Sequence, residues 1–323
     1  MKNSNNKKIA IIFGATGQDG SYLAKSLIDS NYNVYGVTRN LKPCSNHVKL
    51  KIENKIKLIQ INELTKEACF ELIDELNPDE IYNLMGPSSV AYSFEHPKEA
   101  IDLSLANCLS ILEAIRLSAK INIKFFNASS TDCYGDTKLE TINENYKFSP
   151  KSPYASGKAS CSMAVDIYRN AYGLYAVSGI LSNHESVLRD VNFVTMKCVD
   201  SAKKISQGKL DILELGNISI KRDWGWAKEY VEAMRLMLKN SEPRNYIIAT
   251  GKTVSLEYFV DGVFNFFDMD YKNFISINKD FIRPNEINEI NLDPHLIEKD
   301  LGWKASSKID EIINKLCISS IKK

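Results

Sequence analysis

The chain has 323 residues, 44% of them hydrophobic, which is enough to bury a full core in one large domain or two closely joined ones. Its 41 basic and 40 acidic residues almost cancel, which argues against tight binding to nucleic acid or to a charged membrane surface. The longest apolar stretch near the start, IAIIF, is too short for a signal peptide or a membrane span, so we expect a cytoplasmic protein.

The cysteines and histidines give no sign of a metal site. The seven cysteines are scattered without a CxxC pair, and there are only four histidines. This pattern is typical of reduced, structural thiols, so we expect neither disulfides nor a bound metal.

Short β-rich runs alternate with helix-like segments through the first half of the chain. Strands are predicted over residues 8–13, 33–37, 57–61, 80–84 and 122–126, and helices from about residue 21, through 68–76 and over 100–119. Because consecutive parallel strands need a crossover, and a helix is the usual one, the pattern predicts an α/β fold with a doubly wound parallel sheet of Rossmann type.

The second half of the chain has shorter predicted strands and more polar loops. We therefore expect residues 1–184 to form a dinucleotide-binding domain, to which some later strands and helices return. Residues 185–323 are expected to form mainly a smaller α/β lobe at the carboxyl ends of the strands.

A glycine-rich turn, GATGQDG, directly follows the first predicted strand and opens a helix. Gly14, Gly17 and Gly20 would let the backbone turn sharply and approach a pyrophosphate, whose charge the helix N-terminus stabilises. Thr16, Gln18 and Asp19 lie in the same turn. In this strand–turn–helix context the turn predicts a dinucleotide site.

The residues after the next strands indicate which dinucleotide binds. Thr38 and Arg39 follow the second strand, where an NAD site would usually place an acidic residue, and a hydroxyl with a guanidinium suits a 2′-phosphate. We therefore expect NADP rather than NAD. Glu63, Leu64 and Leu84 follow the third and fourth strands, where adenine and ribose would lie.

The segment SPYASGK places Tyr154 and Lys158 four residues apart on a predicted helix, so both side chains share one face. A nearby ammonium favours the phenolate form of a tyrosine, which makes Tyr154 a candidate base for removing an alcohol proton. The hydroxyl-rich segment SSTDCYGD precedes it, after a predicted buried strand.

Several motifs together resemble the GDP-mannose 4,6-dehydratase group of the extended short-chain dehydrogenases. They include GATGQDGSYLAKSL, NASSTDCYGD, SPYASGK, GILSNHES, KRDWGWAKEYVEAM, YIIATG and LGWK, and they span nearly the whole chain. SNHES and KRDWGWAKEYV are the more specific ones, because they belong to the nucleotide-sugar lobe of that group. The resemblance therefore implies a lyase that uses NADP and acts on a GDP-sugar, in surface-glycan biosynthesis.

The resemblance also implies roles for single residues. The catalytic residues of the group fall on Ser130, Asp132, Tyr154 and Lys158. Hydride leaves carbon 4 of the hexose, Asp132 removes the proton on carbon 5, water departs from carbon 6, and the hydride returns to carbon 6. Ser88, His184 and Arg189 are further cofactor contacts by the same comparison. The implied nucleotide-sugar contacts are Ser89, Asn183, Lys197, Gly216, Arg222, Arg283 and Glu286.

Some positions depart from the group's pattern. Asp132 replaces a glutamate and so withdraws the carboxylate by one methylene, and Pro87 and Ser89 stand where the group has Gln and His. The sugar could thus be mannose, N-acetylglucosamine or a heptose, and the reaction could stop at the ketone, as in a 4-oxidoreductase or epimerase. A nucleotide-sensing protein on a retired scaffold is a third reading. A homodimer or homotetramer is expected.

Overall fold

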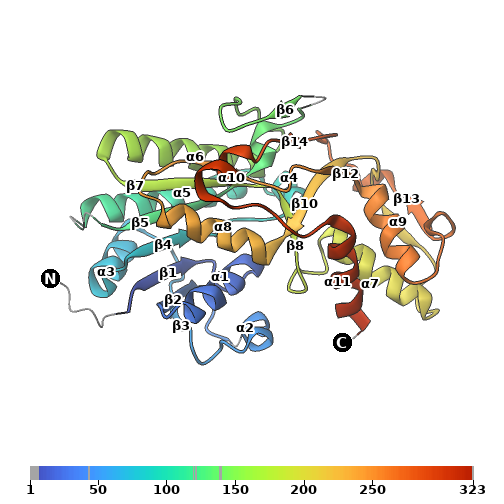
Figure 1. Ribbon diagram of the computed structural model, residues 1–323, viewed down its shortest axis with the longest axis horizontal. Coiled ribbons are helices and arrows are strands. Elements are labelled where there is room, and N and C mark those ends of the chain that lie inside the picture. Colours follow the sequence, from blue (N-terminus) through green and yellow to red (C-terminus); the bar gives the residue numbers. More distant parts are fainter. Residues whose placement is uncertain (1–6, 43, 119, 121, 138–139, 322–323) are drawn as a thin grey trace. The chain divides into compact units, whose positions relative to one another are not determined.

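The computed structural model describes residues 7–42, 44–118, 120, 122–137 and 140–321, which form two compact units (Figure 1). The first unit comprises Met1–Cys133, Ser152–Ile180 and Val231–Tyr246, and the second comprises Tyr134–Lys151, Leu181–Tyr230 and Ile247–Lys323. The chain therefore enters each unit three times, and the expected ranges 1–184 and 185–323 do not coincide with the units.

The first unit is built on parallel strands joined by helices. Its strands are β1 (Ile9–Phe13), β2 (Asn33–Thr38), β3 (Lys57–Gln60), β4 (Glu80–Asn83), β5 (Lys124–Ser130) and most of β7 (Tyr175–Leu181). Its helices are α1 (Gln18–Asp29), α2 (Ser45–Leu50), α3 (Lys66–Leu76), α4 (Val90–Glu95), α5 (Pro97–Leu117) and α6 (Pro153–Tyr172). The chain passes between the units within η1 (Thr131–Tyr134), β7, α8 (Ala227–Lys239) and β11 (Tyr246–Ile248).

The main sheet has the strand order β11-β7-β5-β4-β1-β2-β3. The pairs β1–β2, β1–β4, β2–β3 and β4–β5 all run parallel. The five strands expected from the first half of the sequence are β1 to β5, so the predicted doubly wound α/β sheet is confirmed. Because β4 and β2 lie on opposite sides of β1, the strand order reverses at β1, next to the glycine turn.

Helices cover both faces of this sheet (Figure 1). Buried side chains of α3, α5 and α6 form one apolar cluster with β1, β4 and β5, which includes Phe13, Ile111 and Phe125. On the other face, Arg235 of α8 donates to the hydroxyl of Ser30 at 2.7 Å, directly after α1. The carboxyl ends of the strands are thus left for polar side chains.

The second unit contains three small sheets and a helical layer. Its strands are β6 (Thr141–Ile142), β8 (Asn183–Glu185), β9 (Leu213–Leu215), β10 (Lys221–Trp226), β12 (Thr253–Ser255), β13 (Ile275–Ile277) and β14 (Asn291–Leu292). Its helices are α7 (Val194–Ser206), α9 (Leu256–Phe266), α10 (His295–Leu301) and α11 (Ile309–Ile321). The sheets have the orders β12-β10-β8, β13-β9 and β14-β6. Residues 134–151, which we expected in the first domain, lie in this unit because β6 pairs with β14.

The glycine turn between β1 and α1 is tightly packed. Gly14 has a φ of 84°, a conformation that side chains rarely tolerate, and a Cβ added to it would lie 3.0 Å from the Leu84 carbonyl. A Cβ added to Gly20 would lie 2.2 Å from the Gly14 oxygen. Gly17 is less constrained, since its added Cβ would lie 3.5 Å from the same oxygen. Two of the three predicted glycines are therefore required by the backbone itself.

Among the residues that the structure describes, no helix is both long enough and apolar enough to cross a membrane.

We predict that Gly20→Ala lowers the free energy of unfolding by about 1–3 kcal/mol, because the new methyl group would overlap backbone atoms that no side-chain rotation can move. Gly17→Ala is the matched control from the same turn and should change stability by less than about 1 kcal/mol. Chemical denaturation of both variants measures the difference. Equal stabilities would contradict the packing that we describe for Gly20.

Candidate active site

Strand β5 delivers two of the predicted catalytic residues to its carboxyl end. Ser130 is the last residue of β5 and is 8% exposed, while Asp132 lies two residues later in a short 3₁₀ turn, η1 (Thr131–Tyr134). The backbone N–H of Asp132 donates to the Ser130 hydroxyl oxygen at 3.2 Å. This turn therefore holds the Asp132 backbone against the Ser130 hydroxyl oxygen and leaves the hydroxyl proton of Ser130 for another acceptor.

Helix α6 delivers the other two. Its N-terminus is capped by Ser152, whose hydroxyl accepts from the Ala155 N–H at 3.1 Å, and Pro153 occupies the first turn. Tyr154 follows in that turn and is half-buried, and Lys158 lies one turn further on and is 9% exposed. The predicted spacing thus places both residues on one face of a helix.

The Lys158 ammonium is held by the main sheet. Its Nζ donates to the Ala128 carbonyl at 2.9 Å and to the Met85 carbonyl at 3.3 Å. Burial lowers the pKa of Lys158, because a charged group loses hydration inside the protein. The two carbonyls fix the orientation of the ammonium. A fixed ammonium is what a residue that assists Tyr154 would need.

A second set of buried contacts joins α6 to β5. The Ser162 hydroxyl donates to the Ser129 hydroxyl at 2.7 Å, and the Cys133 thiol donates to the Ala155 carbonyl at 3.5 Å. Both contacts join α6, which carries Tyr154 and Lys158, to the segment that carries Ser130 and Asp132. The structure therefore brings Ser130, Asp132, Tyr154 and Lys158 to neighbouring places in the first unit.

The glycine turn has the features of a dinucleotide site. Gly14 packs against Leu84, and both residues are predicted to contact the cofactor. Gly17 is the N-cap of α1 and provides no side-chain hydrogen bond to the helix N-terminus. The carbonyl of Thr16 accepts from Asn46 Nδ2 at 3.3 Å. Gln18 and Asp19 lie in the first turn of α1. A helix N-terminus beside close-packed glycines fits a pyrophosphate.

The predicted ribose and adenine contacts follow β2 and β3. Arg39 is exposed, and its carbonyl accepts from Gln60 Nε2 at 3.1 Å, while the Thr38 hydroxyl contacts the Asn40 carbonyl at 3.1 Å. Glu63 is exposed, whereas Leu64 packs against the apolar cluster of the first unit. A guanidinium is therefore presented at the carboxyl end of β2.

The two predicted serines after β4 differ in their surroundings. Ser88 is exposed. Ser89 caps α4, since its hydroxyl accepts from the Tyr92 N–H at 3.2 Å. The residue that replaces the group's histidine thus has a local structural role, while its hydroxyl proton is still available to a ligand.

In the second unit, β8 and the following loop hold three predicted residues. Asn183 and His184 lie in β8, and the His184 Nδ1 donates to the Ser182 carbonyl at 2.7 Å. Arg189 pairs with Glu185, with 3.5 Å between Nε and Oε2. The Ser182 contact fixes the tautomer of His184 with its proton on Nδ1.

The remaining predicted substrate residues form two groups in the second unit. Lys197 lies over the Phe281 ring at 4.6 Å, and Gly216 approaches the Phe281 carbonyl so closely that a Cβ would lie at 2.7 Å. Arg222, which is 5% exposed, lies 3.6 Å from the Glu286 carboxylate, and Arg283 lies 3.4 Å from the same oxygen. Residues 281–286 thus connect the two groups.

Sequence reasoning missed one buried acid beside these residues. Asp223 is 2% exposed and accepts from the Ser182 hydroxyl at 3.0 Å and from the Thr250 N–H at 3.0 Å. Burial raises the pKa of Asp223. The same Ser182 hydroxyl lies 2.6 Å from the Tyr230 hydroxyl, and the Tyr230 ring stacks on His184 at 4.7 Å. In the sequence Asp223 directly follows two basic residues, so no local pattern marked it as a buried acid.

Comparison with solved structures shows the same fold in nucleotide-sugar enzymes. UDP-glucose 4-epimerase from Thermotoga maritima matches with a TM-score of 0.84 at 20% identity, over 97% of this chain and 98% of the other. The dTDP-glucose 4,6-dehydratase of Bacillus anthracis, solved with NAD, matches with a TM-score of 0.84 at 17% identity, over 98% and 97% of the two chains.

Sequence comparison is more specific. The model of the family described as GDP-mannose 4,6 dehydratase matches residues 11–316. The GDP-mannose 4,6 dehydratase of Cricetulus griseus is 36% identical, with 96% of this chain and 90% of the relative covered. The Vibrio cholerae GDP-mannose 4,6-dehydratase is 34% identical, with 98% and 94% covered. This chain therefore belongs to the GDP-mannose 4,6-dehydratase family.

Proposed function

We propose that the protein is a GDP-sugar 4,6-dehydratase, a hydro-lyase whose leading substrate is GDP-mannose and which serves surface-glycan biosynthesis. The observation that carries this proposal is the group formed by Ser130, Asp132, Tyr154 and Lys158, because it supplies a hydroxyl, a carboxylate and a phenol–ammonium pair. Relatives from animals, plants and bacteria that bear the name GDP-mannose 4,6-dehydratase support the substrate.

NADP is the proposed cofactor. The glycine turn suits a pyrophosphate, and the exposed Arg39 after β2 suits a 2′-phosphate. Solved neighbours contain either NAD or NADPH, as in the Pseudomonas aeruginosa RMD structure with NADPH. When bound, the nicotinamide would accept a hydride from carbon 4 of the hexose and return it to carbon 6.

Tyr154 is the proposed base at the carbon 4 hydroxyl. Its phenolate would take the hydroxyl proton, and the Lys158 ammonium, oriented by the Ala128 and Met85 carbonyls, would stabilise that phenolate. Ser130 would donate its hydroxyl proton to the same sugar oxygen, because its own oxygen already accepts from the Asp132 N–H. A ketone then forms at carbon 4.

Asp132 is the proposed acid–base group for dehydration. The carbon 4 ketone makes the neighbouring carbon 5 proton acidic, and the Asp132 carboxylate would remove it. The electron pair left on carbon 5 forms a double bond to carbon 6 as the carbon 6 hydroxyl departs, and the proton held by Asp132 converts that hydroxyl to water. As the hydride returns to carbon 6, carbon 5 would take a new proton from solvent, and release of the proton that Tyr154 took from the carbon 4 hydroxyl would balance it, which completes the 4-keto-6-deoxy product.

The shorter carboxylate favours one alternative. Because Asp132 replaces a glutamate, its reach is less by about 1.5 Å, and a displacement of about 1 Å can cost about a hundredfold in rate. A GDP-sugar 4-oxidoreductase or epimerase that stops at the ketone is therefore the second candidate.

We also propose a homodimer. Large apolar side chains on α5 and α6 are exposed, including Leu103 at 40%, Met163 at 52% and Ile167 at 58%. Large apolar side chains exposed on two helices that pack against each other are typical of an interface between proteins.

We predict that the purified protein removes one water from GDP-mannose without added cofactor, because the hydride is returned within each turnover. Separate incubations with GDP-mannose, GDP-N-acetylglucosamine and a GDP-heptose, read by mass spectrometry, identify the sugar. Loss of two hydrogens instead of water would favour the 4-oxidoreductase, and no change in any of the three would contradict the proposal.

We predict that Asp132→Asn slows water loss by about 10²- to 10⁴-fold, the usual contribution of a positioned acid or base. The backbone contact with Ser130 is kept in this variant, so the turn should not change. Asp132→Glu is the matched control and should dehydrate at least as fast as the parent. The readouts are product mass and deuterium uptake at carbon 5 in D₂O. Dehydration by the Asn variant at the parental rate would show that another group removes the proton.

We predict that activity declines as the pH rises, and that this decline begins at a lower pH than it would if Lys158 were exposed to solvent. Burial lowers the pKa of Lys158, so its ammonium loses its proton earlier as pH rises, and Tyr154 then loses the charge that favours its phenolate. Lys158→Arg keeps a permanent charge and should remove this decline while reducing the overall rate. The pH profile of kcat/KM tests this, and an unchanged alkaline decline in the Arg variant would contradict it.

A further inference from the structure

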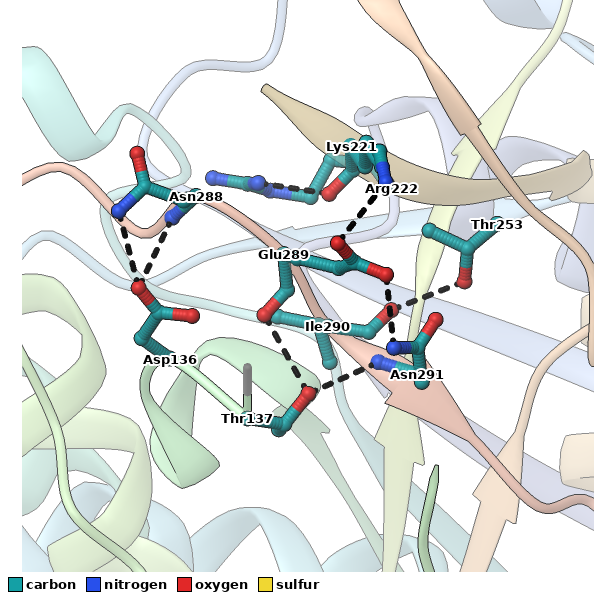
Figure 2. A network of polar contacts seen from close by, with 9 residues as sticks. All are labelled: Asp136, Thr137, Lys221, Arg222, Thr253, Asn288, Glu289, Ile290 and Asn291. Carbon is teal, nitrogen blue, oxygen red and sulfur yellow. Dashed lines mark hydrogen bonds and ion pairs between the residues drawn. The ribbon is translucent and has the colours of Figure 1, made fainter. Parts of the chain in front are cut away.

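A polar network in the second unit holds the segment that follows Arg283 and Glu286 (Figure 2). Residues 286–290 lie outside the regular strands, and β14, which follows, pairs over only two residues with β6. Such a segment has few ladder hydrogen bonds to fix its register. Its position is set instead by contacts with the loop after η1, with β10 and with Thr253 of β12, whose hydroxyl donates to the Ile290 carbonyl at 3.0 Å.

The loop directly after η1 supplies the first contacts. Asp136 accepts from the side-chain amide of Asn288 at 3.0 Å. Thr137 donates its N–H to the Glu289 carbonyl at 3.1 Å, and its hydroxyl donates to the same carbonyl at 3.3 Å. The Thr137 hydroxyl also accepts from the Asn291 N–H at 3.1 Å. One threonine therefore satisfies a backbone carbonyl and a backbone N–H two residues apart.

Strand β10 supplies contacts from the other side of the segment, as Figure 2 shows. The Lys221 N–H donates to the Asn288 carbonyl at 2.7 Å, and the Lys221 ammonium donates to the Glu289 carboxylate at 3.0 Å. The same carboxylate accepts from the Asn291 side chain at 2.8 Å. The hydrogen bond from Asn291 lowers the pKa of Glu289, so this carboxylate is ionised at neutral pH.

These contacts determine where the proposed nucleotide contacts lie. Arg222 directly follows Lys221 in β10, and Glu286 precedes Glu289 by three residues, so the pairing of Lys221 with Glu289 fixes the distance between Arg222 and Glu286. A slip of one residue would move Glu286 by about 3.3 Å. Arg222 is buried, so moving Glu286 away would separate this buried charge from a carboxylate partner and would destabilise the fold.

We propose that Thr137 and Glu289 are positioning residues for nucleotide binding, which arrange Arg222, Arg283 and Glu286 before a GDP-sugar arrives. This inference rests on the proposed function. Arginines and a carboxylate that are already in place bind a diphosphate and ribose hydroxyls without a further cost of ordering the loop. Neither Thr137 nor Glu289 needs to touch the ligand.

The test is GDP binding by isothermal titration calorimetry together with steady-state kinetics on the full-length protein. Thr137→Val has the same shape but loses the hydroxyl, which leaves the Asn291 N–H without this acceptor. We expect about tenfold weaker GDP affinity and a similar rise in KM for GDP-mannose, with kcat within about twofold of the parent. Glu289→Gln keeps the acceptor for Asn291 but loses the ion pair with Lys221, and should show a smaller loss, about threefold.

Two controls separate positioning from general destabilisation. Thr137→Ser keeps the hydroxyl and should bind GDP within about twofold of the parent, and Thr141→Val makes the same substitution at an exposed threonine of β6. A lower Tm for Thr137→Val with unchanged GDP affinity would overturn the inference, as would an equal loss in Thr137→Ser. If the parent protein itself fails to bind GDP, the proposed function fails, and that result is visible before any variant is compared.

Discussion

The burial of one ammonium group constrains the catalytic part of this protein. Lys158 is buried inside the first unit, where hydrogen bonds from its ammonium to the carbonyls of Ala128 and Met85 offset the loss of hydration. Those carbonyls belong to β5 and to the residues that follow β4, so α6 must lie against the carboxyl ends of these strands. Tyr154, one turn earlier on α6, is placed by the same requirement. The placement of both proposed catalytic residues of α6 thus depends on how the fold buries this charge.

Most of the first unit could be predicted because its signals are local. Strands buried on both faces, such as β1 and β5, are short apolar runs in the sequence, and the helices between them are long enough to show their periodicity. The second unit could not be predicted in this way. Strands β6 and β14 have two residues each and are more than a hundred residues apart in the sequence, so their pairing depends on contacts such as that between Thr137 and Glu289.

The same distinction applies to the site. Tyr154 and Lys158 could be placed together from helix geometry, and the Ser130–Asp132 contact follows from a turn of three residues. The proximity of Arg222 and Glu286, by contrast, joins residues 64 positions apart, and only the family resemblance pointed to both. Asp223 was missed because nothing in a single sequence shows that a charged residue will be buried and bonded to backbone N–H groups.

The replacement of glutamate by Asp132 is best understood with its neighbours. The turn that carries Asp132 is held on one side by the Ser130 hydroxyl and on the other by the Cys133 thiol, which donates to a carbonyl of α6. It therefore cannot move outward by a methylene length without breaking buried contacts. Any compensation for the shorter side chain would therefore have to come from the substrate rather than from the turn.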